Sequence, residues 1–176
     1  DEKGQKTAAD IKTELSRFKK MLRKMKALGL EFLTIYGREP LLWDKEASST
    51  NSFLRELIYW SRQKLNLRVC LATSGIKLNE PVLRTLFENN GILVMKDWGS
   101  EKSVTKLMGR NCYKLIQSSW SLVNKIKADY DKTRVIAEFL YTGLNRKDLL
   151  PFWKRCLENN IIPFVETPVI SGNCVK

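Results

Sequence analysis

The sequence of 176 residues contains no histidine. Histidine is the commonest general base and a frequent zinc ligand, so its absence excludes Ser-His and Cys-His catalysis and His-ligated zinc. No run of 18 or more apolar residues and no charged-then-apolar leader is present, which argues against a membrane span or a secretory signal. The sequence therefore predicts a soluble cytoplasmic protein whose chemistry relies on carboxylates, lysines or a bound cofactor.

Cysteine is also scarce, and its spacing is wide. The four cysteines are separated by 42, 44 and 18 positions, and they are Cys70, Cys112, Cys156 and Cys174. This spacing is neither a small disulfide framework nor a CxxC metal knuckle, so we expect reduced, individually buried thiols. The sequence also lacks GxGxxG and GxxxxGK[ST], which disfavours ordinary dinucleotide sites and a phosphate-binding α/β enzyme.

Positive charge is abundant. The formal net charge is +12, and the first thirty residues carry nine Lys or Arg against four acids. This charge admits nucleic acid as a partner. However, apolar residues recur there at spacings of three and four, at Ile11, Leu15, Phe18, Leu22, Met25 and Leu28. The pattern predicts an amphipathic helix and favours a solvated basic face over a nucleic-acid site, with an anionic ligand or an acidic partner protein left open.

Helical spacing alternates with short continuous apolar runs along the rest of the chain. Helices are expected over residues 11–29, 52–65, 79–91, 111–127 and 145–160, and strands over residues 30–36, 67–75, 91–98, 133–142 and 161–168. Asn79 is the predicted N-cap of its helix, and Pro151 is tolerable only in the first turns of the last helix. The apolar run at 30–36 predicts a strand buried on both faces. Residues 1–176 are expected to form one domain, with 1–10 as a polar leader.

Alternating strands and helices predict an α/β fold with a parallel sheet. Right-handed crossovers place the carboxyl ends of all strands at one edge, where such folds bind ligands. The residues expected at this edge are mainly polar: Gly37, Arg38, Glu39, Thr73, Ser74, Gly75, Lys96, Asp97, Trp98, Thr142, Asn145, Glu166 and Thr167.

Glu138 is unusual because it lies within an apolar strand. An unpaired buried carboxylate is costly or stays protonated. We therefore expect either that Glu138 faces the barrel lumen and a ligand or that it pairs with a lysine such as Lys96. Glu166, beside Pro168, is a weaker case of the same kind.

Five segments resemble motifs of the radical S-adenosylmethionine enzymes in order and spacing: GREPLL, ATSG, VMKDW, LYTGLN and NNIIPFVETPVISG. The family has GGEPLL after its second strand, TNG after the third and a charged turn after the fourth. The resemblance covers residues 11–172. It implies a parallel-stranded partial (β/α)6 TIM-like barrel in which S-adenosylmethionine lies across the strand ends and is reductively cleaved by a four-iron (4Fe-4S) cluster.

The resemblance also implies roles at the first strand end. Glu39 would balance the methionine ammonium, and Gly37 would let the ligand approach the backbone. Arg38 replaces the second glycine of the family, and it either crowds the ligand or points outward. Alternatively, Gly37 and Pro40 form a turn and Glu39 pairs with a lysine.

Two further strand ends have implied roles. Thr73 and Ser74 would lie near the methionine carboxylate or the ribose, although capping of their own turn explains them as well. Lys96 and Asp97 would lie near the ribose or the substrate, in a turn one residue shorter than the common family pattern.

The sequence departs from the family at the cluster loop. The family ligates its cluster through CxxxCxxC after the first strand, and no such triplet is present. With an opening helix and no initial methionine, this predicts a core lacking its first strand and cluster loop, either a fragment or a degenerate relative, which alone does not hold the cluster. An uncovered strand edge at 30–36 would favour self-association. The alternative function is a noncatalytic basic scaffold that binds nucleic acid or a partner protein through the first helix. If the chain is part of an enzyme, its sequence does not specify whether the substrate is a small molecule or a peptide.

Overall fold

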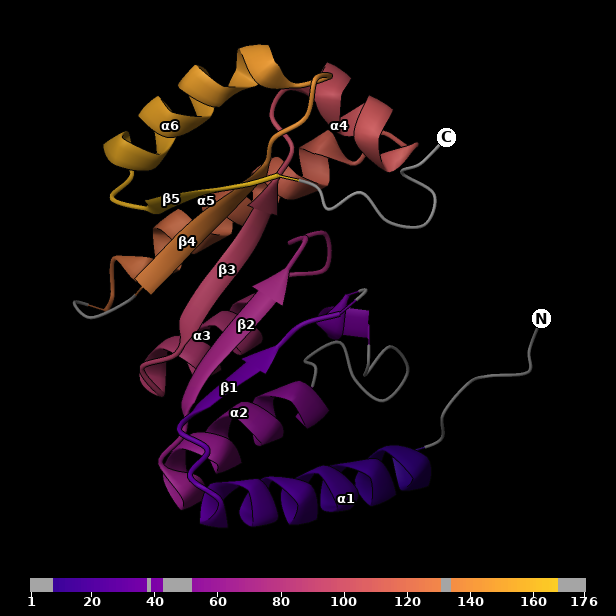
Figure 1. Cartoon of the computed structure of the whole chain (residues 1–176), viewed down its shortest axis with the longest axis vertical. Helices are drawn as coiled ribbons and strands as arrows, with labels where there is room; N and C mark the ends of the chain where they lie inside the picture. Colours follow the sequence, from indigo (N-terminus) through magenta and orange to yellow (C-terminus); the bar gives the residue numbers. More distant parts are fainter. Residues whose placement is uncertain (1–7, 38, 43–51, 131–133, 168–176) are drawn as a thin grey trace.

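The sheet is parallel throughout. A computed structural model describes residues 8–37, 39–42, 52–130 and 134–167. Five strands in these ranges pair in chain order: β1 (Phe32–Ile35), β2 (Arg68–Thr73), β3 (Ile92–Asp97), β4 (Arg134–Leu140) and β5 (Ile162–Glu166). Parallel neighbours require a crossover between them, which the intervening helices supply. The predicted α/β fold is therefore confirmed, and the curved sheet corresponds to a partial TIM-like barrel (Figure 1).

Helices cover one face of the sheet and its two ends. They are α1 (Ala8–Ala27), α2 (Ser52–Leu65), α3 (Glu80–Glu88), α4 (Glu101–Met108), α5 (Tyr113–Lys127) and α6 (Leu149–Glu158), with 3₁₀ turns at Pro40–Leu42 and Arg146–Asp148. Figure 1 shows α3 and α5 behind the sheet and α1 and α6 at opposite ends. Among the described helices, none combines the length and apolar character that a bilayer crossing requires.

Local sequence signals place most of these boundaries. The Asn79 side chain accepts a hydrogen bond from the Val82 amide at 3.1 Å, as expected of an N-cap, and Pro81 lies in the first turn of α3. Pro151 is the third residue of α6, where its missing N–H leaves no broken hydrogen bond. Two expectations need correction: α1 begins at Ala8, inside the expected polar leader, and α4 was not predicted.

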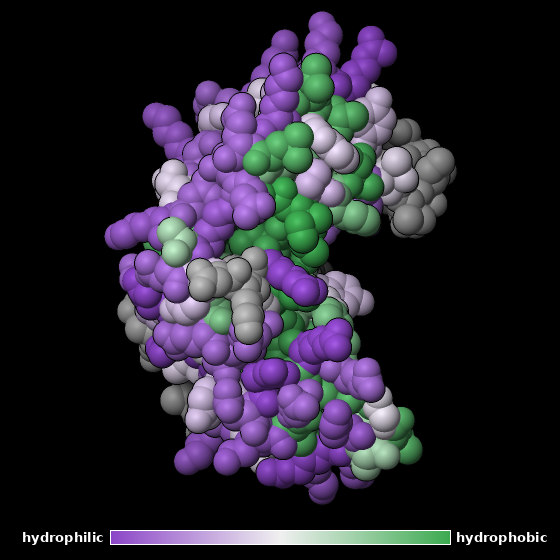
Figure 2. All heavy atoms as spheres, turned by 90° about the vertical axis from the view of Figure 1, so that its left-hand side faces the viewer, coloured by the Kyte–Doolittle hydropathy of each residue, from purple (hydrophilic) through white to green (hydrophobic). Residues whose placement is uncertain are grey.

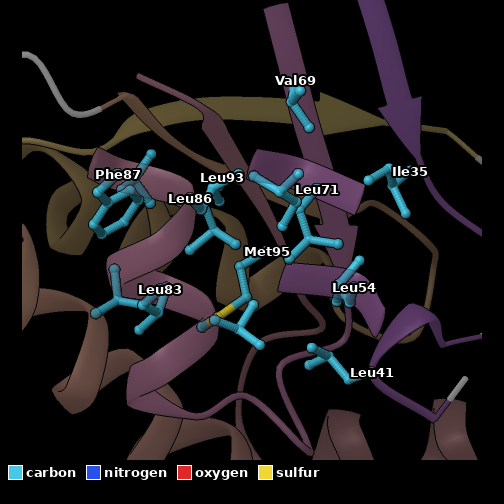
Figure 3. Close-up of a cluster of buried hydrophobic side chains, with 14 of the residues drawn as sticks. Ile35, Leu41, Leu54, Val69, Leu71, Leu83, Leu86, Phe87, Leu93 and Met95 are labelled. Carbon is cyan, nitrogen blue, oxygen red and sulfur yellow. The ribbon is translucent and has the colours of Figure 1, made fainter. Parts of the chain in front are cut away.

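The core lies between the sheet and the helices behind it. Side chains of β2, β3 and β4 alternate between this core and the opposite face, because successive strand residues point to opposite sides. Leu71, Leu93 and Met95 are fully buried. Figure 3 shows these side chains facing Leu83 and Leu86 of α3. One face of the sheet is thus committed to packing and the other is left for a cavity.

The edge strand β1 differs from its prediction. It was expected to be buried on both faces, but Phe32 is 42% exposed and Thr34 is also exposed. Only Ile35 of this strand is buried. Within the described ranges β1 pairs with β2 alone, so an apolar run that looks central from its sequence lies at the edge of this sheet.

Candidate functional site

A cavity of about 850 Å³ opens on the face of the sheet away from the helices. In Figure 2 the molecule is hollowed on its right side, and hydrophobic residues run along it there. The volume is in the range of ligand-binding pockets. Its apolar lining includes Leu42, Ala72, Ile76, Val94, Trp98 and Met108, and its polar lining includes Thr34, Tyr36, Gly37, Glu39, Cys70, Thr73, Ser74, Lys77, Lys96, Arg110, Glu138 and Glu166.

Glu39 is the best organised polar group of the cavity. Its Oε1 accepts hydrogen bonds from Thr73 Oγ1 at 2.6 Å and from the Leu41 amide at 3.3 Å. Its Oε2 accepts from the Ser74 amide at 3.0 Å and from Ser74 Oγ. The tips of β1 and β2 are therefore tied together by one carboxylate. Arg38, also predicted at this site, lies outside the described residues.

Of the two roles expected for Thr73 and Ser74, the structure shows the capping of their own turn, and contact with a ligand stays a prediction. Thr73 Oγ1 accepts a hydrogen bond from the Gly75 amide at 3.0 Å, so it caps its own turn as well as contacting Glu39. Gly75 has φ +82°, and a Cβ there would lie 3.0 Å from Met95 Sδ. Only glycine fits this turn without strain, and the turn directs the two hydroxyls toward the cavity.

Lys96 and Glu138 lie side by side on the floor of the cavity. They are register partners in β3 and β4, and Lys96 Nζ lies 3.5 Å from Glu138 Oε1. The side chain of Glu138 is 14% exposed and that of Lys96 is 44% exposed. Glu138 therefore pairs with Lys96 as the second alternative predicted, and it also lines the cavity, where contact with a ligand stays a prediction. Glu166 of β5 lines the same part of the cavity.

Asp97 is not brought together with the other predicted site residues. It follows Lys96 in the strand, so its side chain points to the helix-covered face, where it is 3% exposed. There its Oδ2 pairs with Arg155 Nη2 of α6, and its Oδ1 accepts from the Gly99 amide at 2.8 Å. The structure gives Asp97 a supporting role for the loop after β3 and removes it from the cavity.

That loop is held by a second carboxylate, which the sequence did not indicate. Asp148 Oδ2 accepts from the Ser100 amide at 3.0 Å, from Ser100 Oγ at 3.0 Å and from Ser103 Oγ at 2.5 Å. Burial would raise the pKa of Asp148, but the hydrogen bonds from Ser103 and Ser100 lower it overall. Asp148 therefore caps the start of α4 from the turn that follows β4.

Asn145 has a similar supporting role. It is 1% exposed, and its Nδ2 donates to the carbonyl oxygens of Leu140 at 2.8 Å and Trp98 at 3.3 Å. Its Oδ1 accepts from the Thr142 amide at 2.8 Å. The predicted rim residues Thr142 and Asn145 thus join the loops after β3 and β4, and neither is among the residues that line the cavity.

The three cysteines in the described ranges do not form a metal site. Cys70 in β2, Cys112 before α5 and Cys156 in α6 are free and buried, as expected, and Cys174 lies outside the described residues. No group of three or more His, Cys, Asp or Glu residues suited to a metal occurs in the parts of the chain that the structure describes. Burial, first of all, raises the pKa of the Cys70 thiol to about 11, so it is a poor metal ligand near neutral pH. The described residues do not fit a four-iron cluster.

The basic face of α1 is partly engaged within the chain. Lys19 pairs with Glu56 of α2, and Lys19 and Arg23 lie 5.6 Å and 5.2 Å from the ring centroid of Trp60. These contacts secure α1 against α2 by ion pairing and by cation–π attraction. They account for two of the basic residues without any nucleic acid.

No protein-family model and no curated protein matches the sequence. Solved structures do match the fold. Native anSMEcpe with bound AdoMet and Kp18Cys peptide gives a TM-score of 0.63 at 17% identity, over 85% of this chain and 41% of that chain. SuiB of Streptococcus suis bound to precursor peptide SuiA gives 0.68 at 16% identity, over 89% of this chain and 33% of that chain.

These likenesses establish the fold, because identities this low carry no site residues with them. The chain spans less than half the length of either matched chain. The partial TIM-like barrel expected from the radical S-adenosylmethionine resemblance is therefore the architecture that this chain shares with structures holding AdoMet or a precursor peptide.

Proposed function

We propose that this chain is the core of a radical S-adenosylmethionine enzyme and binds S-adenosylmethionine in the cavity at the strand ends. The observation that carries the proposal is the arrangement around Glu39: a carboxylate that accepts from two hydroxyls and two backbone amides and lines a cavity of about 850 Å³. An amino-acid zwitterion presents one ammonium and one carboxylate, and this group of side chains offers a partner to each.

Binding would exchange hydrogen bonds at Glu39. Each of its oxygens already accepts two hydrogen bonds from the chain, which uses the roughly four acceptor positions of a carboxylate. The hydroxyls of Thr73 and Ser74 rotate freely about their C–O bonds, so they can turn toward a ligand carboxylate. The ligand ammonium would then take the positions on Glu39 that the hydroxyls release, and the Ser74 amide would keep the side chain in place.

The other end of the ligand would lie against the apolar lining. Ile76, Val94 and Trp98 give the cavity a surface suited to a purine base. Gly37, at the tip of β1, lines the cavity and has no side chain to crowd the ligand. The AdoMet bound by the matched anSMEcpe structure supports this assignment at the level of fold.

The reductive chemistry of the family needs a 4Fe-4S cluster. The described cysteines are in separate elements and do not fit such a cluster. We therefore assign this chain the binding of S-adenosylmethionine and expect no cleavage of it by the chain alone. The substrate of the complete enzyme, a small molecule or a peptide, belongs to the same proposal, and the peptide in the matched SuiB structure favours a peptide.

Calorimetry of the purified chain with S-adenosylmethionine tests the proposal. Glu39→Gln removes the charge and should weaken binding by about 1.5–3 kcal/mol, roughly ten- to a hundredfold, as expected for a hydrogen bond to a charged group. Binding of 5′-methylthioadenosine, which lacks the amino-acid moiety, should change little in the same variant. A change below twofold for S-adenosylmethionine, or equal losses for both compounds, would contradict the assignment of Glu39.

A further inference from the structure

A second group of charged side chains lies in the cavity, apart from Glu39. Lys96 on β3, Glu138 on β4 and Glu166 on β5 come from three successive strands and all line the cavity. Lys96 Nζ is 3.5 Å from Glu138 Oε1, and Glu166 lies close enough to raise the pKa of Glu138.

The surroundings of Glu138 differ from those of its partners. Burial, first of all, and the neighbouring carboxyl group of Glu166 raise the pKa of Glu138, while Lys96 opposes the rise. Cys70 on β2 also interacts with Glu138; its pKa is raised to about 11, mainly by burial, so this thiol keeps its proton. Glu166 is exposed, whereas the side chain of Glu138 is only 14% exposed.

We propose that Glu138 is the proton-accepting group of the cavity, with Lys96 as a positioning residue and Glu166 as the route by which the proton reaches solvent. The proposal deepens the function proposed above, because it assigns the same cavity substrates that must lose a proton from a C–H, N–H or O–H bond. A carboxylate whose proton affinity is raised toward the working pH is a better base than an ordinary glutamate.

The proposed step moves one proton from the substrate to solvent through Glu138 and Glu166. A carboxylate oxygen of Glu138 forms a bond to the substrate proton, the substrate bond to that proton breaks, and its electron pair stays on the substrate. Glu138 then passes the proton to the neighbouring carboxylate of Glu166, which is exposed and releases it to solvent, and Glu138 returns to the carboxylate. Lys96 holds the Glu138 carboxylate in place throughout.

The probe is 5-nitrobenzisoxazole, which needs neither S-adenosylmethionine nor a cluster. A base removes its C3 proton, the N–O bond breaks, and the electron pair leaves on the oxygen as a coloured phenolate. The wild-type chain should convert it faster than an equal concentration of acetate. Glu138→Gln should slow the reaction roughly tenfold or more, since base catalysis of this kind contributes 10²-fold or more in well-placed sites. Glu158→Gln, an exposed carboxyl change on α6, is the matched control and should keep the rate.

The pH profile separates proton transfer from a merely structural role. Glu166→Gln removes a group that raises the pKa of Glu138, so the inflection of the rate should move to lower pH. Lys96→Met removes a group that lowers it, so the inflection should move to higher pH. If Glu138→Gln does not fold, these opposite shifts still test whether Glu138 is the group whose titration controls the rate.

Three results would overturn the proposal: a wild-type rate no greater than that of acetate, an unchanged rate in folded Glu138→Gln, or an inflection that neither neighbour moves. Calorimetric binding of S-adenosylmethionine is measured separately. If the chain does not bind S-adenosylmethionine but still converts 5-nitrobenzisoxazole, only the proposed function is refuted. If it binds S-adenosylmethionine but does not convert 5-nitrobenzisoxazole, only the role of Glu138 is refuted.

Discussion

Mutation of Asp97 and mutation of Arg155, which form a buried ion pair, should lower the free energy of unfolding by different amounts. The Asp97 side chain is 3% exposed and that of Arg155 is 35% exposed, so removing one partner is not equivalent to removing the other. Arg155→Met strands a carboxylate in the interior and should lower the free energy of unfolding by about 3–5 kcal/mol at pH 7. Asp97→Asn leaves a guanidinium that still reaches water, and should cost about 1–3 kcal/mol.

The acid side of the pH range sharpens this prediction. Burial raises the pKa of Asp97, and the charge of Arg155 opposes the rise, so the pKa increases further in Arg155→Met. The folded variant then binds a proton more tightly than its unfolded chain does. The penalty therefore grows as the pH rises from the ordinary aspartate value through the raised folded value, and it shrinks on acidification. Asp97→Asn has no such carboxyl, so it lacks the stability that the wild type gains on acidification, and its loss relative to the wild type should be largest in acid and shrink as the pH rises.

Urea unfolding of the wild type and both variants, followed by circular dichroism at several pH values, measures these differences. Lys154→Met, an exposed cation on the same helix, controls for loss of charge from α6. Equal losses in the two variants, or a loss in Arg155→Met that does not fall on acidification, would refute the reasoning that the interior position of Asp97 governs the pair.

Three other expectations follow from the described residues. Gly99→Ala should lower the free energy of unfolding by more than about 2 kcal/mol in thermal or urea melts. The reason is that φ is +94° at this position and a Cβ would lie 2.5 Å from Asp148 Oδ2. A free energy of unfolding within about 0.5 kcal/mol of wild type, as for an ordinary surface change, would contradict this. The unpaired outer edge of β1 should drive self-association that Thr34→Lys reduces, as light scattering over a concentration series would show, whereas a strictly monomeric wild type would mean that the edge is covered. Anaerobic addition of iron and sulfide should give no stable four-iron cluster, and stoichiometric iron with charge-transfer absorption would make Cys112 or Cys174 a ligand.

Much of the fold could be read from local patterns. Short apolar runs with helical segments between them predicted all five strands, and Asn79 and Pro81 predicted the start of α3, because capping depends on neighbouring residues alone. Helix α4 was missed because it has only eight residues, too few for an apolar spacing of three and four to repeat, and because its start is capped by Asp148 from a distant segment. The burial of β1 was overestimated because an apolar composition does not reveal whether a strand has one neighbour or two.

The candidate site, too, could be predicted from the sequence only in part. Strand ends alone predicted that Glu39, Thr73 and Ser74 would lie at one edge of the sheet, since parallel strands bring their carboxyl ends together, and the structure adds the hydrogen bonds that join them. The alternation of side chains along β3 separates Lys96 from Asp97, and it was the tertiary structure that decided which of the two faces the cavity.

Partners far apart in the chain required the folded structure. The partner of Asp97 lies 58 positions away on α6, and no local pattern relates an acid at a strand end to a cation on a later helix. The register of β3 against β4 set Lys96 beside Glu138, and the register of β4 against β5 brought Glu166 to the same pair. Sequence determined which residues are at strand ends and which are apolar, because these depend on local periodicity; tertiary structure decided which charges meet, because register and burial depend on the packing of the whole sheet.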